Sequence, residues 1–173
     1  MNLPRILICS LFVLVHCVSL NAISQPPTTA ANPADSVVVK HTSDGALKTF
    51  PGMEIKVFSG WTSQLKQDLL LLRGPKGELS VWLGRIQSKD PLAAIDQAWS
   101  KAIKGFSRQT SRTTTPPASN GWDSITVINY KSTPIENRFI QAVAFAKGDT
   151  VYVALIDGVI AALQRRGAQL AQI

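Results

Sequence analysis

The chain has 173 residues, of which 18 are basic and 11 acidic, and its formal net charge is +7. This length suits one domain with a single hydrophobic core and is too short for two. The basic excess is spread thinly along the sequence, whereas a nucleic-acid-binding protein concentrates such charge on one element or one face. The composition therefore argues against nucleic-acid binding and is typical of a solvated exterior.

The first 24 residues have the pattern of a secretory signal peptide. A single positive charge at Arg5 precedes a mostly apolar run over residues 6–18, which is shorter than the roughly 20 apolar residues of a membrane-spanning helix. Ala22 and Ser24 are small residues that fit a cleavage site. We therefore predict a periplasmic or secreted protein cleaved near Ala22 to Ser24. A buried N-terminal helix and a retained membrane anchor are the alternatives.

Both cysteines, Cys9 and Cys17, lie within the predicted signal peptide. After cleavage no thiol would be left for a disulfide or for metal binding, so the stability of the mature domain must come from a hydrophobic core. Loss of Arg5 would also leave 17 basic against 11 acidic residues, a net charge of about +6.

Residues 25–46 are rich in Pro, Thr, Ala and Asn, and we interpret them as a tether in which the valines 37–39 are compatible with the start of an edge strand. A single folded domain is predicted over residues 47–173. Apolar and polar residues alternate over 53–58, which is typical of a half-buried strand. Two further apolar runs, within 65–72 and 79–86, flank a turn containing Pro and Gly and predict a β-hairpin.

A helix is predicted from Asp90 and Pro91, because Asp at the N-cap accepts bonds from free backbone amides and Pro is tolerated at the first helical position. Gly105 is the predicted stop. We expect Trp99 to anchor this helix in the core rather than to bind a ligand. The apolar residues at three- and four-residue spacing are Leu92, Ile95, Trp99, Ala102, Ile103 and Phe106.

The remaining elements follow a polar loop over residues 107–120. Strands are predicted over 122–130, 138–146 and 150–156, the last two forming a hairpin, and an amphipathic helix is predicted from Val159 to Leu170. Hairpins with one inserted and one appended helix indicate an α+β fold. We predict an antiparallel sheet of about five to six strands packed against two main helices.

One short motif matches a known catalytic spacing. Ser63 and Lys66 are three residues apart, as in the S-x-x-K motif of penicillin-recognising serine enzymes, where a helical turn brings the lysine amine to the serine hydroxyl. Here the motif precedes a predicted strand, and the Lys-Thr-Gly and Ser-Asp-Asn partner motifs are missing. We therefore interpret the match as accidental.

His41 is the only histidine after the predicted cleavage site, and it lies in the predicted tether, from which a Ser-His-Asp triad would have to recruit it. A zinc site would lack the cysteines and the several histidines that it normally uses. The sequence has neither a dinucleotide-binding glycine motif nor a phosphate-binding loop. We assign no catalytic, metal-binding or cofactor-binding residue and expect no cofactor, while a pair of carboxylates brought together by folding stays open.

Four aromatic residues admit two interpretations. They either fill the core and its rim, which is the common case in a small α+β domain, or form an aromatic recognition face. We favour the first interpretation. The four residues are Trp61, Trp82, Trp122 and Tyr130.

Several short segments between Trp61 and Ile173 follow one another in an order that is also found in a known group of proteins. The segments are Asp68 with the leucines 69–72 before Gly74, Pro75, Lys76 and Gly77; Asp90 and Pro91 with Ala98 and Trp99; Gly121, Trp122 and Asp123; Tyr130 with Ser132, Pro134, Asn137 and Arg138; Ile156, Asp157 and Gly158; and residues 166–170. In this order they resemble the N-terminal accessory region of exported bacterial serine hydrolases of the beta-lactamase family. In those proteins a hydrolase domain with the catalytic serine and lysine follows. That domain is absent here, so none of its catalytic residues can be carried over. The element order is also similar, more weakly, to PsbP-like and Mog1-like domains.

The sequence thus predicts an exported, non-catalytic accessory or binding domain, separated or truncated from a beta-lactamase-family serine hydrolase. The expected partners are such a hydrolase domain or an envelope component, with membrane contact only transiently through the signal peptide. The final helix stops at Ile173, and we expect a hydrolase partner to cover its apolar side. The alternative is a small periplasmic hydrolase whose active site is assembled from scattered residues.

Overall fold

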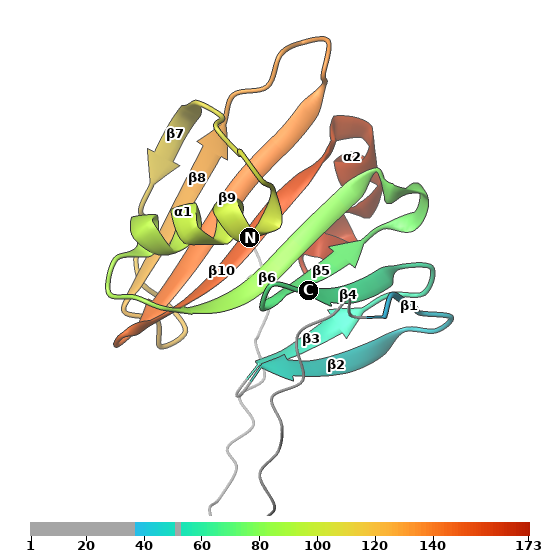
Figure 1. Cartoon of the computed structure of the whole chain (residues 1–173), viewed down its shortest axis with the longest axis horizontal. Helices are drawn as coiled ribbons and strands as arrows, with labels where there is room; N and C mark the ends of the chain where they lie inside the picture. The colour runs from blue at the N-terminus through green and yellow to red at the C-terminus, as the bar shows by residue number, and fades with distance from the viewer. Residues whose placement is uncertain (1–36, 51–52) are drawn as a thin grey trace, which may run out of the picture. The chain divides into compact units, whose positions relative to one another are not determined.

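Two helices lie against an antiparallel β-sheet, one on each face (Figure 1). This computed structural model describes residues 37–50 and 53–173. The predicted signal peptide and residues 25–36 of the predicted tether lie outside the described residues.

The main sheet has eight strands, and every neighbouring pair is antiparallel. In spatial order they are β1 (Val39–Lys40), β4 (Thr62–Lys66), β5 (Leu69–Arg73), β6 (Leu79–Gln87), β10 (Thr150–Val159), β9 (Arg138–Lys147), β8 (Ser124–Tyr130) and β7 (Thr110–Thr114). A separate hairpin pairs β2 (Gly45–Phe50) with β3 (Met53–Val57). The helices are α1 (Pro91–Ala102) and α2 (Ile160–Leu170), with a short 3-10 turn at Pro75–Gly77.

The α+β class, the antiparallel sheet and the two helices are confirmed, but the predicted count of five to six strands is too low. β7 lies in the segment predicted as a polar loop, and it escapes a search for apolar alternation because its five residues are polar and largely exposed. β1 and the start of β2 fall within the range 25–46, so ordered structure begins before residue 47. β1 begins at Val39, the last of the three valines that are compatible with the start of an edge strand, and β1 and β2 are joined to β4 and β3 by backbone pairing.

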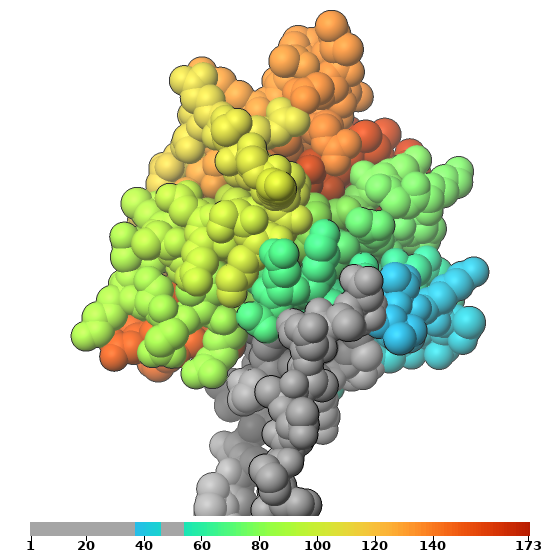
Figure 2. All heavy atoms as spheres, viewed as in Figure 1, coloured from blue at the N-terminus to red at the C-terminus, as the bar shows by residue number. Residues whose placement is uncertain are grey.

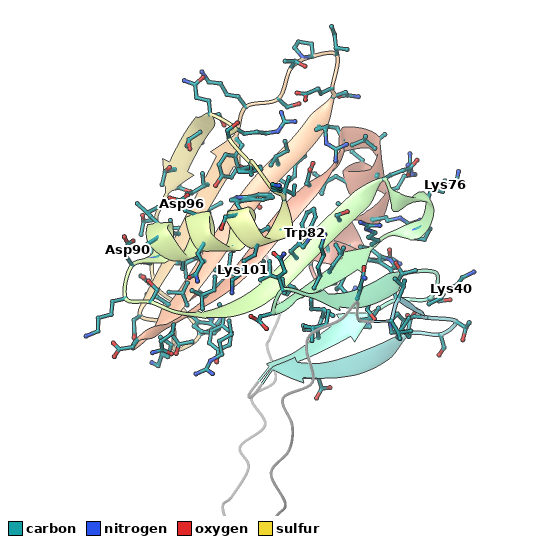
Figure 3. All side chains as sticks on the ribbon, in the orientation of Figure 1. Lys40, Lys76, Trp82, Asp90, Asp96 and Lys101 are labelled. Carbon is teal, nitrogen blue, oxygen red and sulfur yellow. The ribbon has the colours of Figure 1, made fainter. Side chains whose placement is uncertain are left out.

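α1 begins where the sequence predicts. The carboxylate of Asp90, labelled at the first turn in Figure 3, accepts a hydrogen bond of 2.8 Å from the amide of Leu92. The helix ends at Ala102, because Ile103 has extended backbone with φ of −137°. The predicted stop at Gly105 is therefore three residues late, although Gly105 does adopt a positive φ of 74° in the turn that follows.

The first hydrophobic cluster lies between α1 and the sheet. Trp99 is buried at its centre, which confirms the predicted core anchor. Its ring stacks on Phe106 with centroids 3.9 Å apart and meets Trp82 edge-on at 6.1 Å. In the space-filling view the residues of α1 cover the middle of this face of the sheet (Figure 2).

The second cluster lies on the opposite face, under α2 and β3. Ile55 and Val57 of β3 and Ala162 of α2 are buried there with Trp61. The indole Nε1 of Trp61 donates a bond of 3.2 Å to Oε1 of Gln169. The C-terminal residues Leu170 and Ile173 pack against the same cluster.

β5 contributes to both clusters, since its four leucines 69–72 are all buried. Successive side chains of a strand point to opposite faces, so Leu69 and Leu71 join the first cluster while Leu70 and Leu72 join the second. Leu69 lies directly opposite Gly84 of β6. A Cβ atom at Gly84 would clash with Cδ2 of Leu69, so the missing side chain provides the space that Leu69 occupies.

Neither helix of the described chain combines the length and the apolar character that crossing a bilayer requires.

Candidate functional site

Three of the four aromatic residues considered from the sequence lie in or beside the core. Trp61 and Trp82 are buried in the second and first clusters respectively, on opposite faces of the sheet. Tyr130 is half-buried against Trp99, and burial raises the pKa of its hydroxyl. The four rings therefore do not form one recognition face. Only Trp122 is left as a candidate contact for a ligand.

Trp122 belongs to a separate group of three rings. Its centroid is 5.4 Å from that of Phe145 and 5.4 Å from that of Tyr152. Phe145 of β9 and Tyr152 of β10 lie opposite each other across the hairpin. The indole thus lies across two neighbouring strands, and all three rings are half-buried.

A hollow of about 570 Å³ opens beside this group. Its volume is in the range of ordinary small-molecule sites, roughly 300–1,000 Å³. The hollow is lined by two aromatic rings and by several polar side chains. Its lining residues are Glu54, Asn120, Gly121, Trp122, Lys147, Thr150 and Tyr152.

The turn before Trp122 fixes the backbone that carries the indole. Asn120 and Gly121 adopt positive φ angles of 54° and 81°, a conformation that Asn and Gly tolerate best, and the amide of Trp122 donates to the carbonyl of Ser119 at 3.1 Å. The Nζ of Lys147 donates to the carbonyl oxygen of Gly121 at 2.6 Å. The turn is therefore tied to the end of β9.

Asp123 completes this attachment. Its Oδ2 accepts a bond of 2.7 Å from the amide of Gly148, and its Oδ1 lies 3.2 Å from Nζ of Lys147. The Gly148 amide and then the Lys147 ammonium lower the pKa of the Asp123 carboxyl. The charge of Lys147 is thereby matched within the protein, at the edge of the hollow.

The polar residues of the lining offer both donors and acceptors. Glu54 reaches it from β3, and Thr150 from the start of β10. The Thr150 hydroxyl also lies 3.4 Å from Nη2 of Arg85 and 3.4 Å from Oε1 of Gln87. Aromatic surface with a few oriented polar groups is the usual composition of a binding site for a small organic molecule.

The S-x-x-K residues do not assemble as they do in a serine hydrolase. Ser63 and Lys66 lie on β4, where residues three apart point to opposite faces. Ser63 is buried, whereas Lys66 is exposed. The arrangement that brings the amine to the hydroxyl on a helix is therefore not formed.

The structure instead pairs Ser63 with His41. Nε2 of His41 lies 2.8 Å from Oγ of Ser63, and the backbone of His41 is bound to Gly60 and Trp61. The sequence places His41 in the predicted tether and does not indicate this contact, because the contact depends on the pairing of β1 with β4, and no local pattern shows which strands pair.

Among residues 37–50 and 53–173, no three His, Cys, Asp or Glu side chains gather closely enough to hold a metal ion.

No protein-family model and no curated protein matches this chain. Among solved structures, it is similar to the solution structure of the cyanobacterial PsbP protein, CyanoP, from Synechocystis sp. PCC 6803, with a TM-score of 0.50 over 83% of this chain and 92% of that one. The chain has a PsbP-like fold. Sequence identity is 8%, so the likeness concerns the fold and carries no function with it. The weaker of the two resemblances noted in the sequence is thus the one that the structure supports.

Proposed function

We propose that this protein is an exported, non-catalytic binding domain and that the hollow beside Trp122 is its ligand site. The observation that carries the proposal is a half-buried indole set against Tyr152 and Phe145 by a turn that is bonded at both ends. Such prearrangement lowers the entropy lost on binding. Export is proposed from the pattern of the first 24 residues.

We propose further that the domain acts beside a serine hydrolase of the beta-lactamase family. The support is the series of segments from Trp61 to Ile173 that resembles the accessory region of such proteins. The contact would lie at α2, where Ile160 is exposed although apolar. An S-x-x-K hydrolase domain encoded in an adjacent reading frame is the expected partner.

The partner is tested by calorimetric titration of the mature chain with that hydrolase domain, together with hydrogen exchange of α2. Binding with slowed exchange through Leu170 supports the association. The absence of such a reading frame, or of any heat of binding, refutes it. Ile160→Ser should weaken binding, while Ile135→Ser, at a residue that is 97% exposed in the loop before β9, is the matched control.

One observation favours a second candidate function, a small hydrolase. The 2.8 Å contact between His41 and Ser63 is the distance at which a histidine accepts a serine proton. The test is labelling by a fluorophosphonate probe and by a fluorescent penicillin, compared with Ser63→Ala. Labelling that disappears in the variant would replace the binding proposal with hydrolysis. If neither probe labels the protein, the hydrolase proposal fails, and the contact between His41 and Ser63 serves only to join the chain next to β1 to β4.

A further inference from the structure

We propose that the hollow beside Trp122 binds a neutral saccharide, a short run of an envelope glycan. This inference rests on the proposed binding role and adds the ligand class. Three observations support it: the indole of Trp122 is accessible in the hollow, the charged residues of the lining balance one another, and the residues that form its wall are held rigidly.

The ring is the first reason. Trp61, Trp82 and Trp99 are 0%, 7% and 2% exposed, so Trp122 is the one tryptophan of the four whose indole is accessible to a ligand. The face of an indole is electron-rich. The C–H bonds on one side of a pyranose ring form an apolar, weakly positive face that stacks on such a ring.

The charges are the second reason. Lys147 is paired with Asp123 at 3.2 Å, and the lining also contains Glu54 and Thr150, whose hydroxyl lies 3.4 Å from Nη2 of Arg85. Neither sign of charge dominates the lining, so the hollow does not select a strongly charged ligand. The hydroxyls of a sugar, each both donor and acceptor, match the mixture of amide, ammonium, carboxylate and hydroxyl groups.

The wall is the third reason. Trp122 is fixed by the Ser119 turn and by Lys147, and Tyr152 lies in the longest pair of strands in the sheet. A sugar ring is itself rigid, so little conformational entropy is lost when the two rings stack. A hollow of about 570 Å³ has room for more than one such ring.

The test uses the exported, mature chain and the fluorescence of Trp122. Because the other three tryptophans are buried, acrylamide quenches mainly Trp122, and a ligand in the hollow should protect it. The probes are the tetramer of N-acetylglucosamine, cellotetraose and maltotetraose at up to millimolar concentrations, with tetramethylammonium chloride as a cation that aromatic rings also bind. We expect saturable protection by at least one saccharide, with a Kd between micromolar and millimolar.

Variants locate the site by calorimetry. Trp122→Ala should weaken saccharide binding about tenfold or more, and Glu54→Ala, at an exposed residue that does not contribute to the core, should weaken it about tenfold. Ile135→Ser should leave it unchanged. If Trp122→Ala does not fold, the saccharide affinity of Glu54→Ala still tests whether the ligand binds in this hollow.

Three results would overturn the inference: no saccharide protects Trp122, only tetramethylammonium does so, or neither variant changes the affinity. None of these affects the hydrolase titration, so failure of the saccharide and failure of the proposed partnership are separate outcomes.

Discussion

The indole Nε1 of Trp99 donates a hydrogen bond of 3.0 Å to the hydroxyl of Tyr130. This bond joins α1 to β8. It also satisfies the polar atom of a side chain that is otherwise surrounded by carbon.

Replacing Trp99 by Ala should lower the free energy of unfolding by about 3–5 kcal/mol, because it removes a buried ring and leaves a cavity beneath α1. Tyr130→Phe removes only the hydrogen bond and should cost about 1 kcal/mol. Urea unfolding measures both. Equal effects of the two substitutions would show that the ring contributes little, contrary to its burial.

Glu136 should make the stability depend on pH in the acid range. The Arg108 guanidinium, bonded to both carboxylate oxygens, and then the Thr133 amide lower the pKa of Glu136 from 4.5 to about 2. A lowered carboxyl pKa stabilises the folded state above the unfolded value, about 4.5, and this stabilisation is lost as the pH falls through about 2. The difference in unfolding free energy between the wild type and Glu136→Gln should therefore be constant above about pH 5 and should shrink towards pH 2.

The control for this series is Asp149→Asn, which removes the carboxylate of an exposed ion pair 3.5 Å long. Urea unfolding at several pH values between 2 and 7 compares the three proteins. A wild-type advantage over Glu136→Gln that is the same at every pH would contradict the lowered pKa.

Two glycine substitutions should have opposite signs. A Cβ at Gly158 of β10 would lie 2.7 Å from Cδ1 of Leu79 and 3.0 Å from the carbonyl of Glu78, so Gly158→Ala should destabilise by about 1–3 kcal/mol. Nothing lies within 4 Å of a Cβ at Gly167 in α2, so Gly167→Ala should stabilise by about 0.5–1 kcal/mol through helix propensity. Thermal or urea unfolding of both variants tests the pair, and the same sign for both would refute the packing argument.

Fractionation should find the protein outside the cytoplasm, shortened by about 22 to 24 residues, because the apolar run over 6–18 is too short for a stable membrane span. Intact-mass measurement decides the point. A mass that retains Met1 would favour the anchor or the buried helix instead.

The elements that the sequence predicts correctly are those that bury a regular apolar face. The run 69–72, the helix from Asp90 and the hairpin of β9 and β10 all have such a pattern. β7 has no such pattern. It is an edge strand that pairs only with β8, and it is held by backbone hydrogen bonds rather than by buried apolar side chains.

The candidate site was only partly accessible to sequence reasoning. The sequence points to Trp122, but only as one of four aromatic residues that the fold separates. Its neighbours Phe145 and Tyr152 are read from the sequence as ordinary strand residues, and Glu54 comes from a hairpin outside the main sheet. Their proximity depends on long-range strand pairing, which no local pattern records.

The four consecutive leucines of β5 do not by themselves specify the register in which this strand pairs with β6. A slip by one residue would exchange one leucine for another on each face, so burial alone hardly distinguishes the native pairing from its neighbours. The residues that flank the run resolve the ambiguity, because a slip in either direction would bring Asp68 or Arg73, both exposed, into the position of a buried leucine. The two charged residues at the ends of the run thus set which leucines face which half of the core.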